Sequence, residues 1–245
     1  MPSYKFSYFD LRGRGEPSRM LFAAAGIPFT DKRVTQEEFG KMKATDPYAS
    51  LPILEVTAGN DAYMMNQSMA INRHLARTFE DPFLSLPILE VSNAGGKGSQ
   101  ETVVMNQSMA INRHLARTFG LDGETLNDKA MVDEIIENLV DLKGAMFPIF
   151  FNDNEETRKK FADTQAKMCP KLEAQIQRNM KKGGGFAVGS KMTFADIFIF
   201  EAFESILGKD ASCLDKYPGI KQCREKTGKH PKIAEYVKKR KETPF

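Results

Sequence analysis

Hydrophobic and polar residues alternate at the start of the chain and then take the spacing of helices. Residues 4–9 alternate as in a half-buried strand, and the mostly apolar run 19–25 ends at Gly26, a residue type that commonly terminates helices. A second strand is predicted at 28–35 and a short helix at 36–44. The chain therefore begins with the order strand, helix, strand, helix.

The segment that follows these elements occurs twice. The copies span residues 46–79 and 81–119, and the stretch 65–79 recurs without change as 105–119. Each copy predicts a strand, a hairpin, a second strand and a helix. Stacked repeat folds normally need three or more copies, so we regard one copy as surplus and predict the order βαβαββα for the N-terminal half. A surplus segment can extend the edge of the sheet, because the free energy of loop closure rises only slowly with loop length.

The C-terminal half has the pattern of long helices. One apolar face is formed by residues at helical spacing, namely Met131, Ile135, Ile136, Leu139 and Leu142. Further helices are predicted at 155–180, 194–207 and 231–240. The change of pattern predicts two domains, an α/β domain at 1–121 that contains the repeat and an all-α domain at 122–245.

Charge and hydropathy exclude two classes of partner. Lys and Arg number 35 and Asp and Glu 32, which gives a net charge of +3, too slight and too dispersed for a nucleic-acid interface. The longest apolar runs, such as 20–27 and 197–203, fall well short of the roughly 20 residues of a membrane span. The first residues lack the continuous apolar run of a signal peptide. We therefore expect a cytoplasmic protein with neither a nucleic-acid nor a membrane partner.

The cysteines do not indicate a metal site or a disulfide framework. Cys169, Cys213 and Cys223 are odd in number and form no C-x-x-C pair, and the three histidines are scattered along the chain. We expect reduced, mostly structural thiols and no metal.

Four motifs occur in an order that is typical of one family. Residues 4–16 read Tyr-Lys-Phe-Ser-Tyr-Phe-Asp-Leu-Arg-Gly-Arg-Gly-Glu, 51–56 read Leu-Pro-Ile-Leu-Glu-Val, 66–71 read Asn-Gln-Ser-Met-Ala-Ile, and 193–196 read Thr-Phe-Ala-Asp. Together they resemble the cytosolic glutathione transferases, in particular the sigma class, which includes glutathione-dependent prostaglandin D synthases and the S-crystallins. The resemblance implies a thioredoxin-like glutathione-binding domain, an all-α C-terminal domain and a homodimer. Thr193 and Asp196 also fit a capping box, which is structural.

The resemblance implies glutathione as co-substrate, a hydrophobic electrophile as second substrate, and Tyr8 as the catalytic residue at the end of the first strand. A free thiol has a pKa near 8.5, and lowering it to about 6.5 corresponds to roughly 2.7 kcal/mol. One hydrogen bond to a charged group supplies about 1.5–3 kcal/mol. The phenol is protonated at neutral pH and can donate this bond. Arg14, by resemblance, reinforces the field that favours the thiolate.

Glutathione contacts are also implied by the resemblance. The residues that match are Phe39, Lys43, Leu51, Pro52, Gln67, Ser68 and, across the dimer, Asp141. The main chain of Leu51, before a cis proline, would pair with the cysteinyl main chain of glutathione as in strand addition. The helix that starts at Gln67 and Ser68 would receive the γ-glutamyl carboxylate, since helix starts favour anions. Phe39 stands where related sequences often carry tryptophan, which predicts weaker binding there.

Two questions about the site residues stay open at this point. The repeat copies compete for one glutathione site, and we expect the first copy to form it; the second copy offers Leu86, Pro87, Gln107 and Ser108 instead. Some of Arg14, Met105 and Phe147 would line the electrophile pocket. An acidic cluster that binds a divalent ion in some relatives is interrupted by Val140, so no metal is expected.

The alternatives to a conjugating enzyme are a non-catalytic, S-crystallin-like binding or structural protein and a glutathione-dependent prostaglandin isomerase.

Overall fold

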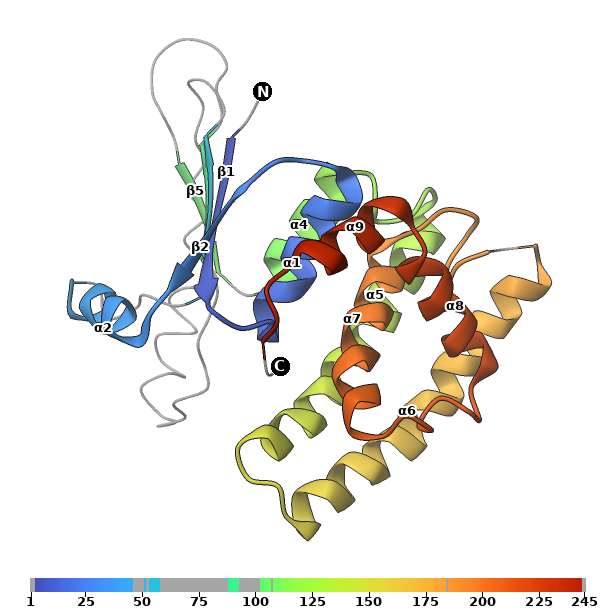
Figure 1. Cartoon of the computed structure of the whole chain (residues 1–245). Coiled ribbons are helices and arrows are strands. Elements are labelled where there is room, and N and C mark those ends of the chain that lie inside the picture. Colours follow the sequence, from blue (N-terminus) through green and yellow to red (C-terminus); the bar gives the residue numbers. More distant parts are fainter. Residues whose placement is uncertain are drawn as a thin grey trace. The chain divides into compact units, whose positions relative to one another are not determined.

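The structure is a computed structural model of the chain (Figure 1). It describes residues 3–45, 51, 53–57, 88–92, 102–106, 108–183 and 185–243, with the main chain only at residues 3, 53–57, 88–92, 102–106 and 209. The chain divides into two compact units. The N-terminal unit consists mainly of residues up to His114, and the C-terminal unit mainly of Leu115–Lys241.

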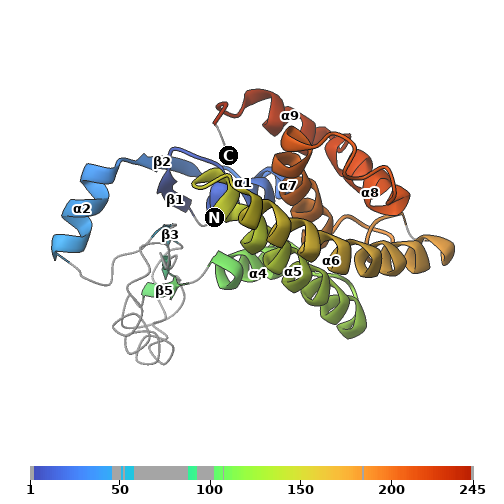
Figure 2. The same cartoon turned by 90° about the horizontal axis from the view of Figure 1, so that it is seen from below.

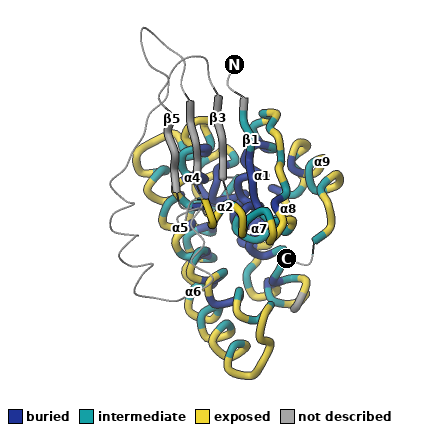
Figure 3. Tube along the Cα trace, turned by 90° about the vertical axis from the view of Figure 1, so that its left-hand side faces the viewer, coloured by how far each residue is buried: buried dark blue, intermediate teal, exposed yellow. Residues whose placement is uncertain are grey.

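The N-terminal unit begins with the four predicted elements. They are β1 (Ser3–Phe9), α1 (Glu16–Ala25), β2 (Thr30–Val34) and α2 (Gln36–Thr45). β1 and α1 carry the core of this unit, where Phe6, Met20 and Leu21 are fully buried. Figure 3 shows buried positions along both β1 and α1. The predicted order strand, helix, strand, helix is therefore confirmed.

The sheet contains strands from both repeat copies. β3 (Ile53–Thr57) belongs to the first copy, and β4 (Ile88–Ser92) and β5 (Thr102–Asn106) belong to the second. The strand order is β2-β1-β3-β4-β5. β1 is parallel to β2 and antiparallel to β3, whereas β4 is parallel to β3 and antiparallel to β5.

This arrangement corrects the predicted order βαβαββα. The equivalent strands of the two copies lie side by side in register, with Ile53 opposite Ile88 and Thr57 opposite Ser92. The second copy therefore extends the sheet beyond β3, as a surplus segment was expected to do. Pairing with β4 satisfies the main-chain groups on the outer side of β3, which an edge strand would leave open. The first copy's identical stretch, 65–79, lies outside the described residues.

The helix after the sheet also belongs to the second copy. α4 (Ser108–Thr118) follows β5 directly and carries the buried side chains of Ile111 and Asn112. The Ser18 hydroxyl of α1 donates a hydrogen bond to the Asn112 Oδ1 atom at 2.6 Å, and both side chains are fully buried. This bond fixes α4 against α1.

The C-terminal unit consists of helices. They are α5 (Leu126–Met146), the short 3-10 helix η2 (Phe147–Phe150), α6 (Glu155–Lys181), α7 (Phe194–Lys209), α8 (Pro218–Gly228) and α9 (Pro231–Lys239). α5 packs along α6 and α7, and α8 packs against α7 (Figure 2). The sequence pattern predicted all of the α-helices except α8. No helix in the described part of the chain is long and apolar enough to span a membrane.

α7 is the central helix of this unit, and all of its residues from Phe194 to Phe203 are buried. Phe194, Ile197, Ile199 and Phe203 are fully buried. The helix starts at the predicted capping box, in which the Thr193 N–H and hydroxyl donate to Asp196 Oδ2 at 2.8 and 2.9 Å. The predicted cap is therefore confirmed. α6, by contrast, is largely exposed along its length (Figure 3).

Candidate functional site

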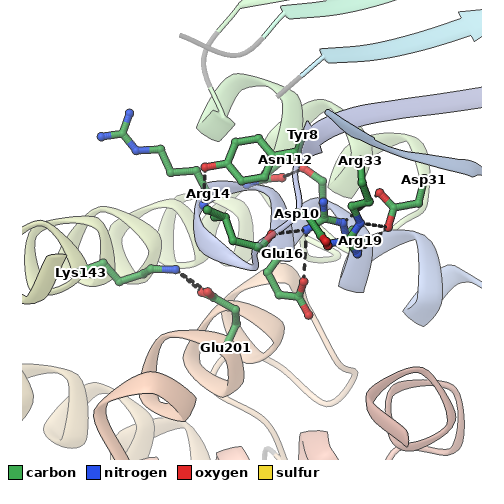
Figure 4. Close-up of polar contacts among 12 residues, drawn as sticks. Tyr8, Asp10, Arg14, Glu16, Arg19, Asp31, Arg33, Asn112, Lys143 and Glu201 are labelled. Carbon is green, nitrogen blue, oxygen red and sulfur yellow. Dashed lines mark hydrogen bonds and ion pairs between the residues drawn. The ribbon is translucent and has the colours of Figure 1, made fainter. Parts of the chain in front are cut away.

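Tyr8 lies near the end of β1, just before the turn that leads into α1. Its side chain is only 5% exposed, and its hydroxyl accepts a hydrogen bond from the main-chain N–H of Arg14 at 3.2 Å (Figure 4). A phenol hydroxyl has one O–H donor as well as two acceptor lone pairs. The bond from Arg14 therefore orients the hydroxyl through an acceptor position and does not use its donor.

Two glycines allow the turn to approach the tyrosine ring this closely. They belong to the 3-10 turn η1 (Gly13–Gly15) between β1 and α1. A Cβ atom on Gly15 would lie 2.6 Å from Tyr8 Cδ1, and one on Gly13 would lie 3.0 Å from the Tyr8 hydroxyl oxygen. Gly13 also has a φ of +40°, which side-chain-bearing residues rarely adopt. These two glycines of the 4–16 motif thus shape the space around Tyr8.

A buried arginine, Arg19, connects this turn to the ring of Tyr8. Arg19 is fully buried, and its Nη1 donates to the carbonyl oxygen of Leu11 at 3.0 Å. Its guanidinium carbon lies 5.8 Å from the centre of the Tyr8 ring and 5.3 Å from that of Phe6, within the range of cation–π contacts. Sequence reasoning missed this residue. The available signal was a charged side chain within an otherwise apolar helical run, because a buried charge needs partners.

Acidic residues on both sides neutralise the Arg19 charge. Asp31 of β2 accepts from Arg19 Nε at 3.1 Å through one oxygen and from Arg33 Nε at 2.9 Å through the other. Glu16, at the start of α1, lies 3.5 Å from Arg19 Nη1 and is itself buried. The network, drawn in Figure 4, ties β2, the turn and α1 together. It therefore holds the surroundings of Tyr8 in one geometry.

The two predicted residues of α2 lie beside the end of β1. The ring of Phe39 contacts that of Phe9 edge to face at 5.3 Å, and Phe9 contacts Tyr8 at 5.8 Å. The Lys43 ammonium lies 5.0 Å from the centre of the Phe39 ring. Phe39 is half-buried and Lys43 is exposed. The structure thus brings both predicted residues together with Tyr8 through Phe9, which sequence reasoning did not single out.

Of the predicted site residues in the repeat region, the structure describes the side chains of two. Leu51 is fully buried, and Ser108 is 9% exposed at the start of α4. The remaining predicted residues of this region lie outside the described residues, or, for Met105, outside the described side chains: Pro52, Gln67, Ser68, Leu86, Pro87, Gln107 and Met105. Their predicted roles stay predictions.

In the C-terminal unit, α5 carries the predicted Asp141 on its exposed side. Two residues further on, the Lys143 ammonium pairs with both carboxylate oxygens of Glu201 on α7 at 2.5 Å and lies 5.4 Å from the Phe198 ring (Figure 4). Glu201 is 4% exposed. A buried carboxylate needs such a partner to remain charged, so the pair fixes how α5 and α7 pack.

The C-terminal unit also contains a mainly apolar cavity of about 460 Å³. Its walls include Met146, Ile149, Phe150, Phe161 and Ile206. The predicted pocket residue Phe147 does not line it, but its ring contacts that of Phe150 at 6.5 Å. A cavity of this size and lining suits a small hydrophobic molecule.

The three thiols are poor nucleophiles at neutral pH. Burial raises the pKa of Cys169 to about 12, and burial together with the nearby Asp210 raises that of Cys213 to about 11. Burial also raises the pKa of Cys223 well above its ordinary value. All three cysteines are free. The described residues contain no cluster of three or more His, Cys, Asp or Glu side chains that would hold a metal ion.

Comparison with known proteins places this geometry in a family. Residues 140–240 match the family model of the glutathione S-transferase C-terminal domain. The chain is 32% identical over 260 residues to S-crystallin 2 of Octopus vulgaris, with both chains covered completely. It is 30% identical over 243 residues to the hematopoietic prostaglandin D synthase of Gallus gallus, with 99% of each covered.

A solved structure agrees with these sequence relationships. The Nu-class glutathione S-transferase of Haemonchus contortus superposes with a TM-score of 0.73 at 27% identity, and both chains are covered completely. The similarity therefore includes the N-terminal unit with its sheet as well as the helical unit. The chain belongs to the glutathione S-transferase family and, by that relationship, is a glutathione transferase.

Proposed function

We propose that this protein conjugates the thiolate of glutathione to hydrophobic electrophiles, with the Tyr8 hydroxyl donating a hydrogen bond to the sulfur. The observation that carries the proposal is the fixed position of that hydroxyl. The Arg14 amide orients it, Gly13 and Gly15 leave room for it, and Arg19 holds the ring from the side of α1. A donor that is already oriented costs no reorganisation when the charge on sulfur develops.

The Tyr8 bond and the nearby positive charges act on the same ionisation. A hydrogen bond to a charged group is worth about 1.5–3 kcal/mol, which is comparable to the roughly 2.7 kcal/mol needed to lower a thiol pKa by about two. The Arg14 guanidinium, which faces the sulfur when glutathione is bound, contributes further to this ionisation. Phenol and arginine together account for a thiolate at neutral pH.

We further propose that the tripeptide lies along the end of β1 and the start of β3. Phe39 and Lys43 line it from α2, with the ammonium of Lys43 available to its glycine carboxylate. The main chain of Leu51 pairs with the cysteinyl residue as an added strand. In a cytoplasmic homodimer of the sigma class, Asp141 of the partner subunit binds the ammonium group of glutathione. These contacts contribute to the affinity for glutathione, whereas Tyr8 accelerates the reaction.

The proposal is tested on the wild-type protein by ultraviolet absorbance of the glutathione thiolate. We expect a thiolate band at pH 7 on mixing with glutathione, because the pKa of the bound thiol lies below neutrality. Conjugation of a hydrophobic electrophile should follow with saturation kinetics. If glutathione binds but neither a thiolate band nor conjugation appears, the proposed activity is wrong.

We expect the Gly15→Ala variant to lose more than tenfold in turnover while it still folds. The added methyl would lie 2.6 Å from Tyr8 Cδ1 and 2.9 Å from Cγ, so the base of the ring has to move. Misplacement of a catalytic group by about 1 Å can cost on the order of 100-fold in rate. Gly40→Ala is the matched control, because a methyl there meets no atom within 4 Å. Equal turnover in Gly15→Ala and wild type would contradict the tight positioning of Tyr8.

Two other activities are each favoured by a specific relative. The 30% identity to a prostaglandin D synthase favours isomerisation of a prostaglandin endoperoxide by the same thiolate. The 32% identity to an S-crystallin favours a binding or structural role in addition. A glutathione-affinity column followed by assays with an electrophile and with an endoperoxide separates them. Retention without turnover of either substrate supports the structural role.

A further inference from the structure

The two repeat copies do not contribute equally to the N-terminal unit. β1 has two edges, of which one pairs with β2 and the other with β3 of the first copy. The equivalent strand of the second copy, β4, therefore lies one strand further out. The repeat strand that pairs with β1, the strand that carries Tyr8, therefore comes from the first copy.

The helix that packs against α1 comes from the second copy. The evidence is the buried hydrogen bond that the Ser18 hydroxyl donates to Asn112 Oδ1 at 2.6 Å. A hydroxyl has a single O–H donor, so the bond admits one asparagine side chain. The equivalent residue of the first copy is Asn72, which lies in an identical stretch of sequence. The described bond assigns the place against α1 to the asparagine of the second copy.

α1 connects this helix to the candidate catalytic tyrosine. Ser18, which bonds α4, is followed by Arg19, whose guanidinium lies over the Tyr8 ring. Ser108 lies one helical turn before Asn112, and residues four apart share a helix face. The start of α4 therefore faces the same side as the residue that docks on α1.

We propose that one glutathione site is built from both copies, the strand with Leu51 from the first and the helix start with Ser108 from the second. Ser108 then serves the γ-glutamyl carboxylate, and its twin Ser68 does not. This inference rests on the proposed function for the identity of the ligand. It rests on the strand pairing and on the Ser18–Asn112 bond for the assignment of the copies.

The ligand part is tested with a matched pair of variants, Ser68→Ala and Ser108→Ala. Both serines have identical neighbours for several residues on either side, so propensity effects are the same in both. Titration calorimetry with glutathione should show about a tenfold higher Kd for Ser108→Ala, since a hydrogen bond to a carboxylate is lost. Ser68→Ala should bind within twofold of wild type. Equal sensitivity of the two variants, or the reverse order, overturns the inference.

The assembly part is tested without glutathione by Asn72→Ala and Asn112→Ala. Asn112→Ala leaves the buried Ser18 hydroxyl without its acceptor, so the midpoint of thermal unfolding should fall by at least about 2 °C. Asn72→Ala should leave the midpoint nearly unchanged. The reverse order means that the first copy's helix docks on α1 and overturns the inference. If this stability pattern holds but the wild type binds no glutathione, the proposed function and the ligand part fail, and the shared assembly stands.

Discussion

The Tyr8→Phe variant is expected to lose about 10- to 150-fold in kcat/KM for conjugation. It removes one hydrogen bond to a charged sulfur, worth about 1.5–3 kcal/mol. The ring itself should keep its place, because it is 5% exposed and in close contact with the turn at Gly13 and Gly15. The Kd for glutathione should change much less, since the phenol contacts the sulfur and not the rest of the tripeptide.

The measurement that separates this role from simple packing is a pH titration of the bound thiol. In Tyr8→Phe the pKa of bound glutathione should rise toward the ordinary thiol value near 8.5, and the thiolate band at pH 7 should shrink accordingly. Tyr4→Phe is the control, because it makes the same change on the same strand at a ring that packs edge to face on Phe22 at 5.2 Å. A thiolate band of equal strength in Tyr8→Phe would exclude the proposed role.

The sequence predicted those parts of the fold that depend on local patterns. The alternation in residues 4–9 and the helix that ends at Gly26 are visible without tertiary information, and both elements are present. The capping box at Thr193 and Asp196 is equally local. α8 was missed because its apolar residues are few, and the Pro-Gly pair at which it starts is more typical of a turn than of a helix.

The arrangement of the repeat is not a local property. Both copies carry the same Ile-Leu-Glu-Val strand, so hydrophobic pattern alone gives no preference for which one pairs with β1. The structure pairs the two strands in parallel and in register. A parallel pair needs a long connection between its strands, and the sequence pattern alone does not indicate that these two strands pair with each other. Because both strands have the same hydrophobic pattern, the choice of which strand pairs with β1 depends on the segments around them rather than on their own residues.

The candidate site likewise contains features that the sequence predicted and features that it did not. The position of Tyr8 near the end of the first strand was predictable because the alternation in residues 4–9 is a local pattern, whereas its catalytic role was implied by the family resemblance. The supporting contacts of Arg19 were not, because arginine is normally exposed and its partners are a main-chain carbonyl at Leu11 and a carboxylate on β2, Asp31. The catalytic candidate is thus readable from sequence, whereas the groups that position it emerge only from the packing of β1, β2 and α1.

The Asp196→Ala variant is expected to cost about 3–5 kcal/mol of stability, because each buried donor left without an acceptor costs about 1–3 kcal/mol. Asp196 is fully buried and accepts from the Ala187 N–H at 2.7 Å and from the Cys223 thiol at 3.0 Å, in addition to the capping bonds from Thr193. Alanine leaves these buried donors without an acceptor. Because whole domains are stable by only about 5–15 kcal/mol, the midpoint of urea unfolding should fall sharply.

Asp210→Ala is the matched control for this variant. Asp210 also accepts two hydrogen bonds, from the N–H and the hydroxyl of Ser212, but it is exposed, so water replaces the lost acceptor. Its unfolding midpoint should stay close to that of the wild type. A comparable loss in both variants would mean that the burial of Asp196 is not what makes it important.

The buried carboxyl also predicts a pH dependence with a definite sign. Burial raises the pKa of Asp196, and the hydrogen bonds from Ala187, Cys223 and Thr193 only partly oppose it. The folded state then binds the proton more tightly than the unfolded state, whose pKa is near 3.9. The stability due to this proton is complete below that value and is lost as pH rises through the folded pKa. Asp196→Asn does not titrate at this position. The difference in unfolding free energy between wild type and this variant should therefore shrink as pH increases from about 4, and a difference that grows instead would show that the charged form is the one the fold favours.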